Sequence, residues 1–205
     1  LSNFVPWDVD IYRCEKEIRF PKWTRKPVLY FGRMDKLKNP TELLDAFKII
    51  EGKRPGEFML ILCGPKSNEI DIEKELIKRG LGGVAMTLPP VPFHSASALM
   101  EAVRHAGGIY VSPSSAESFG LSAAEAISTL LPPVLSGIDS HLDLLGEYSK
   151  TFAYPIGDVD ALVNRIEVLF DNHQSVESAL RALRCNFSAE RFIKDWVSLL
   201  SIFHN

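Results

Sequence analysis

The sequence predicts an α/β fold, a Rossmann-like, doubly wound parallel sheet of about six strands followed by C-terminal helices. Short aliphatic runs bounded by Gly and Pro alternate with stretches of helical period, which is the pattern of βαβ units. After Tyr154 this alternation stops, and only helical patterns follow. We expect the strands at 28–31, 58–63, 84–88, 108–111, 134–135 with its flanks, and 151–154.

Amphipathic stretches lie between and after these strands. The first begins at Pro40, where a missing N–H costs no hydrogen bond, and its apolar face is expected to cover the sheet. That face consists of Leu43, Leu44, Phe47 and Ile50. We expect the other helices at about 70–78, 95–105, 120–130, 158–170, 175–184 and 188–203. The apolar positions of the last helix are interpreted as core: Phe192, Trp196, Leu199, Leu200 and Phe203.

Composition narrows the class of protein. A net charge of −3 and a pI of about 6.0 argue against a nucleic-acid binder, because such proteins need a clustered positive excess. The three cysteines, Cys14, Cys63 and Cys185, show no metal or disulfide spacing, which favours a reducing, cytoplasmic setting. No apolar run approaches the ~20 residues that cross a bilayer. The cytoplasmic face of a membrane is a second setting that we keep open for a longer parent protein.

The start of the chain suggests a fragment, because the first residue is Leu1 rather than Met. Residues 1–26 carry prolines and mixed charges, and we interpret them as an interdomain linker or lead-in. Residues 27–205 then form one domain. At 205 residues the chain is long enough to bury a full core.

The loops after the strands are where a ligand is expected, because open α/β sheets bind ligands outside the carboxyl ends of their strands. The loop after the first strand carries Arg33 and Lys38, close enough to converge on one anion such as a diphosphate. The alternative is two surface bases in a polar loop, and spacing alone leaves both interpretations open.

A second candidate group follows the fourth strand. Glu117 and Glu125 are eight residues apart, and a helix is expected to begin between them near Gly120, so that Glu125 lies two turns along it. Amides at a helix start bind phosphate, and glycine permits close approach of a ligand. The alternative interpretation makes Glu117 a helix cap and Glu125 a solvated helix residue.

Other chemical patterns are weak. Asp8 with Asp10, and Asp158 with Asp160, have the D-x-D spacing of metal sites on sugar diphosphates, but Asp158 is better explained as a helix cap. No dinucleotide fingerprint, P-loop or nucleophile elbow occurs in the sequence. The histidines lack metal-ligand spacing, and His94 alone is expected in a loop at the carboxyl edge of the sheet. These patterns disfavour a dinucleotide dehydrogenase and a P-loop NTPase, and they give only weak evidence for a metal site.

Taken together, these loops resemble the C-terminal, donor-binding domain of retaining glycosyltransferases of the GT-B architecture, the family-4-like group that includes sucrose-phosphate synthases and mannosyltransferases. Residues 112–126, Ser-Pro-Ser-Ser-Ala-Glu-Ser-Phe-Gly-Leu-Ser-Ala-Ala-Glu-Ala, look like the E-x7-E motif of that family. The loop from Gly32 to Lys38 is similar to its Gly-Arg-Leu segment followed by Lys, and residues 5–10 resemble its interdomain segment.

The resemblance implies roles for individual residues. Arg33 and Lys38 would hold the donor diphosphate, Glu117 the sugar hydroxyls and Glu125 the ribose. Further donor-binding residues would be Gly32, Gly64, Phe119, Gly120 and Leu121. The implied reaction is transfer of a hexose from a nucleoside-diphosphate sugar with no metal and no cofactor. The acceptor domain would precede Leu1, so the chain by itself is expected to be inactive.

The sequence also departs from the family pattern. Leu130 stands where the family has glycine, Pro132-Pro133 enter the next strand, and Pro89-Pro90 replace a usual glycine near the expected base. Asp139-Ser140 replace a Gly-Gly pair, which puts bulk near the sugar. These departures keep open a second hypothesis, a non-catalytic nucleotide or nucleotide-sugar binding module. A phosphorylase-like or epimerase-like enzyme is a third.

Overall fold

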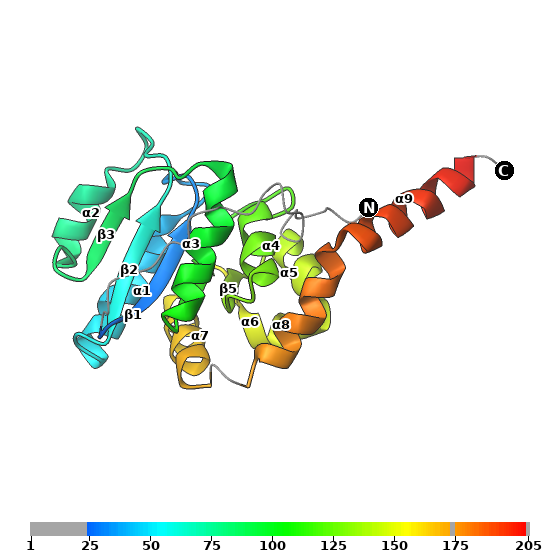
Figure 1. Cartoon of the computed structure of the whole chain (residues 1–205). Coiled ribbons are helices and arrows are strands. Elements are labelled where there is room, and N and C mark those ends of the chain that lie inside the picture. Colours follow the sequence, from blue (N-terminus) through cyan, green and yellow to red (C-terminus); the bar gives the residue numbers. More distant parts are fainter. Residues whose placement is uncertain (1–23, 173–174, 204–205) are drawn as a thin grey trace.

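The computed structural model describes residues 24–172 and 175–203 and confirms the predicted α/β class. Within these residues one sheet of six parallel strands has the order β3-β2-β1-β4-β5-β6 (Figure 1). The strands are β1 (Lys26–Phe31), β2 (Phe58–Cys63), β3 (Ala85–Leu88), β4 (Ile109–Ser112), β5 (Pro133–Ser136) and β6 (Ala153–Tyr154). All six expected strands are present, with ends shifted by at most a few residues.

The two longest strands form the centre of the sheet. β1 and β2 pair in register from Lys26 with Phe58 to Phe31 with Cys63. Most of their residues are buried, because helices cover both faces of a parallel sheet and leave no side for solvent. This is why residues 28–31 of β1 and the whole of β2 read as continuous apolar runs in the sequence.

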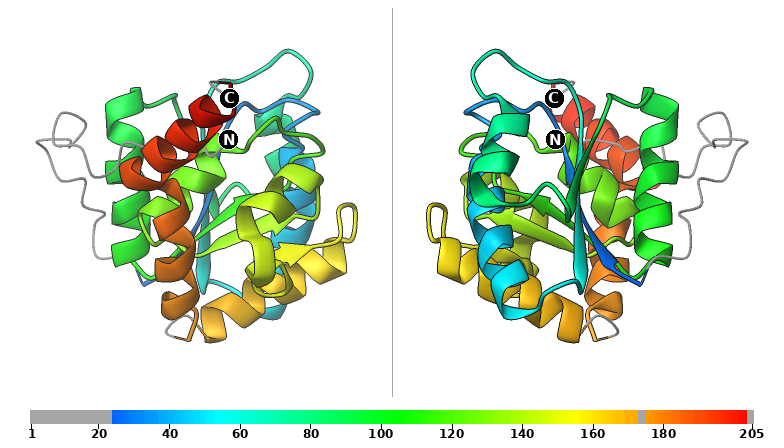
Figure 2. Two further views of the ribbon diagram at one scale, coloured as in Figure 1. Left: turned by 90° about the vertical axis from the view of Figure 1, so that its right-hand side faces the viewer. Right: turned by 90° about the vertical axis from the view of Figure 1, so that its left-hand side faces the viewer.

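Helices cover the sheet in two layers (Figure 2). On one face, α1 (Pro40–Lys53) contacts both α2 (Ile72–Arg79) and α7 (Val159–Asp171). The helices α3 (Phe93–His105), α4 (Leu121–Ser128) and α8 (Glu177–Arg184) form the other layer. The predicted face of α1 is fully buried, and each of its large apolar side chains contributes about 1.5–3 kcal/mol to folding.

Local signals set several helix starts. Pro40 occupies the first turn of α1, as predicted. Asp158 accepts a hydrogen bond from the backbone N–H of Ala161 at 2.9 Å, which confirms it as the cap of α7. Asp71 caps α2 in the same way, so that helix begins at Ile72 rather than at residue 70. His94 lies in the first turn of α3 and not in a loop, which corrects the expectation for that residue.

The segment between β5 and β6 differs most from the prediction. It holds the short helices α5 (Asp139–Leu145) and α6 (Ser149–Phe152) with the 3-10 turn η2 (Gly146–Tyr148), none of which was predicted. Thr151 and Phe152 were expected in the last strand, but they end α6, and β6 keeps only two residues. Phe152 is fully buried in the core from this helix, so its apolar character reflects burial rather than a strand.

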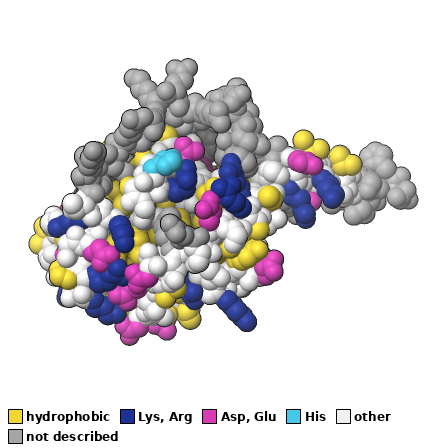
Figure 3. Space-filling model, turned by 60° about the horizontal axis from the view of Figure 1, so that its bottom comes forward, with side chains coloured by type: hydrophobic (Ala, Val, Ile, Leu, Met, Phe, Trp, Pro, Cys, Tyr) yellow, Lys and Arg dark blue, Asp and Glu magenta, His cyan; other side chains and the backbone are white. Residues whose placement is uncertain are grey.

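The last helix corrects the predicted core. After the 3-10 turn η3 (Cys185–Phe187), α9 (Ala189–Phe203) projects away from the rest of the molecule (Figure 1). Trp196, expected in the core, is 40% exposed, and Phe192 is half-buried against the Trp196 ring. Hydrophobic side chains gather along this projecting arm in Figure 3. Phe192 and Trp196 therefore lie outside the core, whereas the expectation for Leu199, Leu200 and Phe203 falls on side chains that the structure does not describe.

Charged groups of both signs mix on the face of Figure 3 that lies at the amino ends of the strands. Arg54 pairs there with Glu57 at 2.6 Å and with Asp171 at 3.1 Å. Lys26 pairs with Glu57 at 3.3 Å. Charges of both signs therefore neutralise one another on this face.

Some expectations lie outside the described residues. Residues 1–23, most of the proposed linker, lie outside them. The same range includes Cys14, the pair Asp8 and Asp10, and the segment 5–10 that resembles the interdomain segment. The linker and the single domain at 27–205 therefore stay predictions.

Candidate functional site

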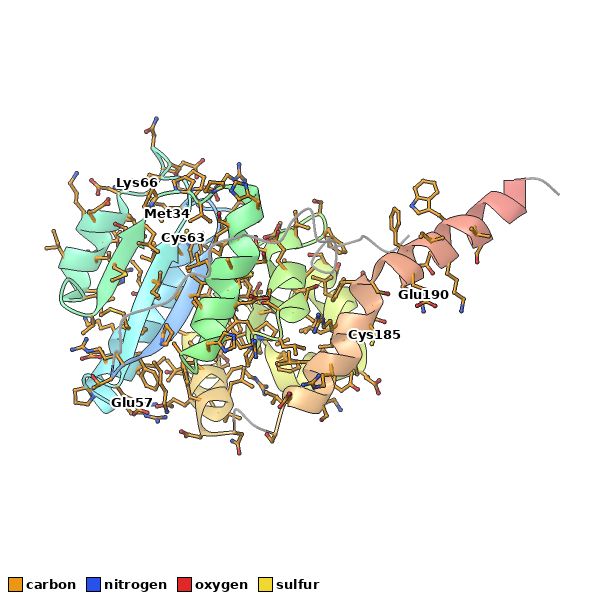
Figure 4. All side chains as sticks on the ribbon, in the orientation of Figure 1. Met34, Glu57, Cys63, Lys66, Cys185 and Glu190 are labelled. Atoms are coloured by element: carbon orange, nitrogen blue, oxygen red, sulfur yellow. The ribbon has the colours of Figure 1, made fainter. Side chains whose placement is uncertain are left out.

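The strand order places a switch point between β1 and β4. The chain winds outward from β1 to β2 and β3, and then returns to add β4, β5 and β6 on the other side of β1. At such a point the loops leave the two strands in opposite directions, which opens a ligand-binding place at the carboxyl edge. Met34, Cys63 and Lys66 lie at this edge, and Glu57 lies at the opposite end of the sheet (Figure 4). The predicted site loops, after β1 and β4, flank the switch point.

The loop after β1 is held in shape by its own hydrogen bonds. Asp35 is buried, and its carboxylate accepts the backbone N–H of Lys38 at 2.9 Å. The hydroxyl of Tyr30 donates to the carbonyl of Arg33. The Arg33 side chain is 59% exposed and contacts Asp35 at 3.2 Å. This cation therefore stands at the rim of the site, open to an anion.

The loops after β1 and β4 are joined directly. The ammonium of Lys38 contacts the carboxylate of Glu117, which also accepts a hydrogen bond from Ser114 Oγ at 2.9 Å. The backbone N–H of Ser115 donates to the carbonyl of Leu37 at 2.8 Å. Lys38 and Glu117, both named from the sequence, thus lie together, and Glu117 does not cap α4 as the alternative interpretation required.

The loop after β2 comes so close to β1 that only glycine fits. Gly64 has a φ of 145°, and a Cβ there would lie 2.1 Å from the carbonyl oxygen of Gly32. The backbone N–H of Met34 donates to the carbonyl of Pro65 at 2.9 Å, which fastens the two loops. Gly32 itself meets no such limit, because a Cβ there would make only ordinary contacts. The steric need is therefore at Gly64.

The start of α4 lies at the switch point. Gly120 precedes it in the left-handed region, with a φ of 84°, and no side chain caps the free N–H groups of the first turn. Leu121 follows and is 47% exposed, whereas Phe119 is half-buried. Uncapped N–H groups at a helix start form a place for an anion such as phosphate. Phe119, Gly120 and Leu121 therefore present backbone beside the Lys38–Glu117 pair.

Glu125 is buried in α4, one turn from its start rather than two. It is only 8% exposed, and burial raises the pKa of its carboxyl to about 7. Within the two described stretches of the chain, no hydrogen bond to this carboxyl is found. The interpretation as a solvated helix residue is therefore wrong. A buried carboxyl without a partner is costly, and such groups concentrate at functional sites.

His141 belongs to the same group of contacts, although the sequence analysis gave it no role. Its imidazole is fully buried in α5, and Nδ1 lies 3.0 Å from the carbonyl of Ser136, so Nδ1 carries the proton. The hydroxyl of Ser136 donates to the carbonyl of Ser114 at 2.6 Å. Burial lowers the pKa of His141, which keeps the ring neutral. The ring thus supports the loop that carries Glu117, and a lone histidine in the sequence has no spacing that would reveal this.

The departures from the family pattern have distinct structural outcomes. Leu130 adopts a φ of 59°, the left-handed conformation that glycine takes most easily, so α4 ends at Ser128 and not at 130. Pro132 precedes β5 and Pro133 begins it, where the backbone of a parallel strand still accepts hydrogen bonds. Asp139 and Ser140 form the first turn of α5, next to the buried His141.

Among the described residues, no group of three or more His, Cys, Asp or Glu side chains is arranged to hold a metal ion. No helix in that part of the chain has the length and apolar character needed to cross a bilayer.

Fold and site together define a Rossmann-like α/β domain whose polar loops meet at the switch point of a parallel sheet. The chain matches the family described as "Glycosyl transferases group 1" over residues 15–183. This match covers most of the chain, which therefore belongs to the group 1 glycosyltransferases.

Curated relatives are glycosyltransferases of bacteria. The chain is 34% identical over 135 residues to the O-antigen chain mannosyltransferase B of Escherichia coli. The aligned residues are 65% of this chain and 34% of the relative. It is 27% identical over 149 residues to the GDP-mannose:cellobiosyl-diphosphopolyprenol alpha-mannosyltransferase of Xanthomonas oryzae pv. oryzae, covering 70% and 37%. The chain therefore spans about a third of the length of these relatives.

Solved structures share the fold. HepE of Anabaena in complex with UDP and glucose superposes with a TM-score of 0.72 at 19% identity, over 87% of this chain and 48% of that one. Sucrose-phosphate synthase of Thermosynechococcus elongatus gives 0.70 at 22% identity, over 88% and 46%. These GT-B neighbours show that the chain has the fold of one half of that architecture.

Proposed function

We propose that this chain is the donor-binding half of a retaining glycosyltransferase that transfers a hexose from a nucleoside-diphosphate sugar. The observation that carries the proposal is the junction of the β1 and β4 loops, where Lys38 contacts Glu117 beside the uncapped start of α4. A cation, a carboxylate and free N–H groups at one switch point suit a ligand that carries both phosphates and hydroxyls. An acceptor-binding half would belong to the longer protein.

The diphosphate is assigned to Arg33, Lys38 and the N–H groups around Phe119, Gly120 and Leu121. Arg33 is exposed at the rim, and Lys38 lies deeper against Glu117. As the bond to the sugar breaks, negative charge grows on the leaving diphosphate. Positive groups already in place stabilise that charge more in the transition state than in the ground state. No metal is needed for this role, and we propose a metal-independent reaction.

The ribose and sugar are assigned to the two glutamates. Glu125 has a buried carboxyl without a partner in the described chain, and adjacent ribose hydroxyls would supply its hydrogen bonds. Glu117 is fixed by Lys38 and Ser114 in the loop above α4, where it would accept hydroxyls of the sugar. Gly64 lets the loops after β1 and β2 approach each other closely, and we assign the backbone of Gly32 and Gly64 to the nucleotide-facing edge of the site.

Calorimetry tests the binding part of this proposal. The 205-residue chain is titrated with UDP, GDP and ADP and their hexose derivatives, with and without a chelator. We expect weak binding of at least one nucleotide series that the chelator does not change. Absence of heat with every compound would contradict the donor site, and loss of binding with the chelator would show that a metal takes part.

A second candidate is a non-catalytic module that binds the same nucleotides. The observation that favours it is the first turn of α5, where Asp139 and Ser140 stand in place of the Gly-Gly pair of the family pattern, directly before the buried His141. The two candidates are separated by an assay of hexose transfer with a longer protein that contains this chain. Nucleotide binding without transfer to any acceptor extract would favour the module.

A further inference from the structure

A pocket that shares Phe119 with the loop of the donor site lies between α5 and the turn that joins α8 to α9. It has a volume of about 400 Å³, within the range of about 300–1,000 Å³ that is usual for small-molecule sites. Phe119, Leu144 and Phe187 line it from three different elements. The rings of Phe119 and Phe187 meet edge to face, with centroids 6.5 Å apart and planes at 78°. The pocket therefore has an apolar, aromatic wall that α4, α5 and η3 hold in place.

Polar side chains stand around this wall. Asp143 and Asn186 also line the pocket, and both are exposed. Ser140 lines it as well, and its Oγ is buried without a hydrogen-bond partner in the described part of the chain. A buried hydroxyl without a partner is costly, and a ligand hydroxyl would satisfy it. The lining thus combines a carboxylate, an amide and a hydroxyl over an aromatic wall.

The charge of the pocket argues against a second phosphate. Arg191 also lines it, but the guanidinium is 3.1 Å from the carboxylate of Asp195. Asp143 also lines the pocket and is exposed, and Arg191 is the one cation among the described lining residues and is already paired. An anion would have to compete with Asp195 for that cation, whereas a neutral polyol would find acceptors and donors together.

We infer that this pocket binds an uncharged pyranose. The apolar face of the sugar ring would lie on the wall of Phe119, and adjacent hydroxyls would donate to the Asp143 carboxylate. Few polar groups over an aromatic surface fix the orientation of a ligand in this way. Phe119 follows Glu117 by two residues, so the pocket lies beside the loop of the donor site. We assign the pyranose to the acceptor glycan, and this assignment rests on the proposed function. The binding of a pyranose in the pocket does not depend on that function.

The test uses saturation-transfer NMR with the 205-residue chain and two neutral probes, methyl α-D-mannopyranoside and methyl α-D-glucopyranoside. We expect millimolar binding of at least one probe, which Asp143→Asn weakens about tenfold, as for one hydrogen bond to a charged group. Asp160→Asn is the matched control, because Asp160 is an exposed carboxylate in α7 that does not line the pocket. Thermal melts of both variants check that the fold is kept.

Three outcomes would overturn the inference: no saturation transfer from either probe, equal loss in both variants, or displacement of the probe by a nucleoside-diphosphate sugar. The last would place the probe in the donor site. The proposed function is measured separately, because Asp143→Asn is expected to leave nucleotide affinity unchanged. A chain that binds the probe through Asp143 but binds no nucleotide would support the pocket and contradict the donor site.

Discussion

Replacement of Glu125 by Gln tests whether this carboxyl is kept in a costly state. Glu125 is 8% exposed, and burial raises its pKa from an ordinary 4.5 to about 7. The folded chain therefore binds this proton more tightly than the unfolded chain does. The protonated carboxyl therefore contributes its full share to the free energy of unfolding below pH 4.5. This contribution is lost as the pH rises to about 7. Glutamine has nearly the same shape and cannot ionise.

The size of the effect follows from the pKa. A rise from 4.5 to about 7 corresponds to about 3 kcal/mol of folding free energy. At pH 8 we therefore expect Glu125→Gln to be more stable than the wild type by up to about 3 kcal/mol. A domain of this length gains about 2–4 °C in Tm per kcal/mol, so the shift approaches about 6–12 °C. At pH 4.5 the two proteins should melt together.

Urea denaturation and calorimetry at pH 4.5 and pH 8 measure this difference. Other groups that titrate in this range are common to both proteins and cancel. Glu147→Gln is the matched control, because Glu147 is exposed in η2 and its variant should show no pH-dependent gain. If Glu125→Gln gains nothing at pH 8 relative to pH 4.5, the carboxyl is not strained by burial and the reasoning is refuted.

The remaining predictions concern binding and the backbone. If the ionised Glu125 holds the ribose, nucleotide affinity measured by calorimetry should fall about tenfold from pH 8 to pH 6, as the carboxylate gains a proton, and should stay constant in Glu125→Gln. Lys38→Ala should weaken nucleoside-diphosphate binding tenfold or more in the same assay, whereas Lys36→Ala, in an exposed part of the same loop, should not. Gly64→Ala should lower the free energy of unfolding by about 2 kcal/mol or more in urea, because its Cβ would strike the carbonyl of Gly32, whereas Gly82→Ala meets open space and should change little. Similar stability of the two alanine variants would show that the loop after β2 relaxes freely.

The sheet could be predicted because parallel central strands are buried on both faces. Phe58–Cys63 reads as an uninterrupted apolar run and is a strand with those bounds. The prediction was wrong for residues 139–152, because the helices there are short, seven and four residues, and depend on packing rather than on caps. For α9, the apolar period correctly indicates a helix, but it cannot say what lies against the apolar face.

The candidate site was predicted in its parts but not in its contacts. The sequence placed Arg33, Lys38 and Glu117 in loops at the carboxyl edge. That Lys38 touches Glu117, 79 residues away, depends on β4 pairing with β1, and strand order is not written in the local pattern. The burial of Glu125 and His141 likewise follows from how α4 and α5 pack. Residue types can be read locally, whereas burial and partners are properties of the whole fold.

The contact between Lys38 and Glu117 sets a condition on any ligand that approaches. An anion that draws Lys38 toward itself must compete with a carboxylate that already holds the ammonium. Inorganic phosphate can take the cation but offers the released carboxylate little in return. A ligand that carries phosphates and sugar hydroxyls on one molecule replaces both partners at once. If the proposed donor site is correct, this ion pair would disfavour inorganic phosphate relative to a nucleoside-diphosphate sugar, independently of the contacts that distinguish the base or the sugar.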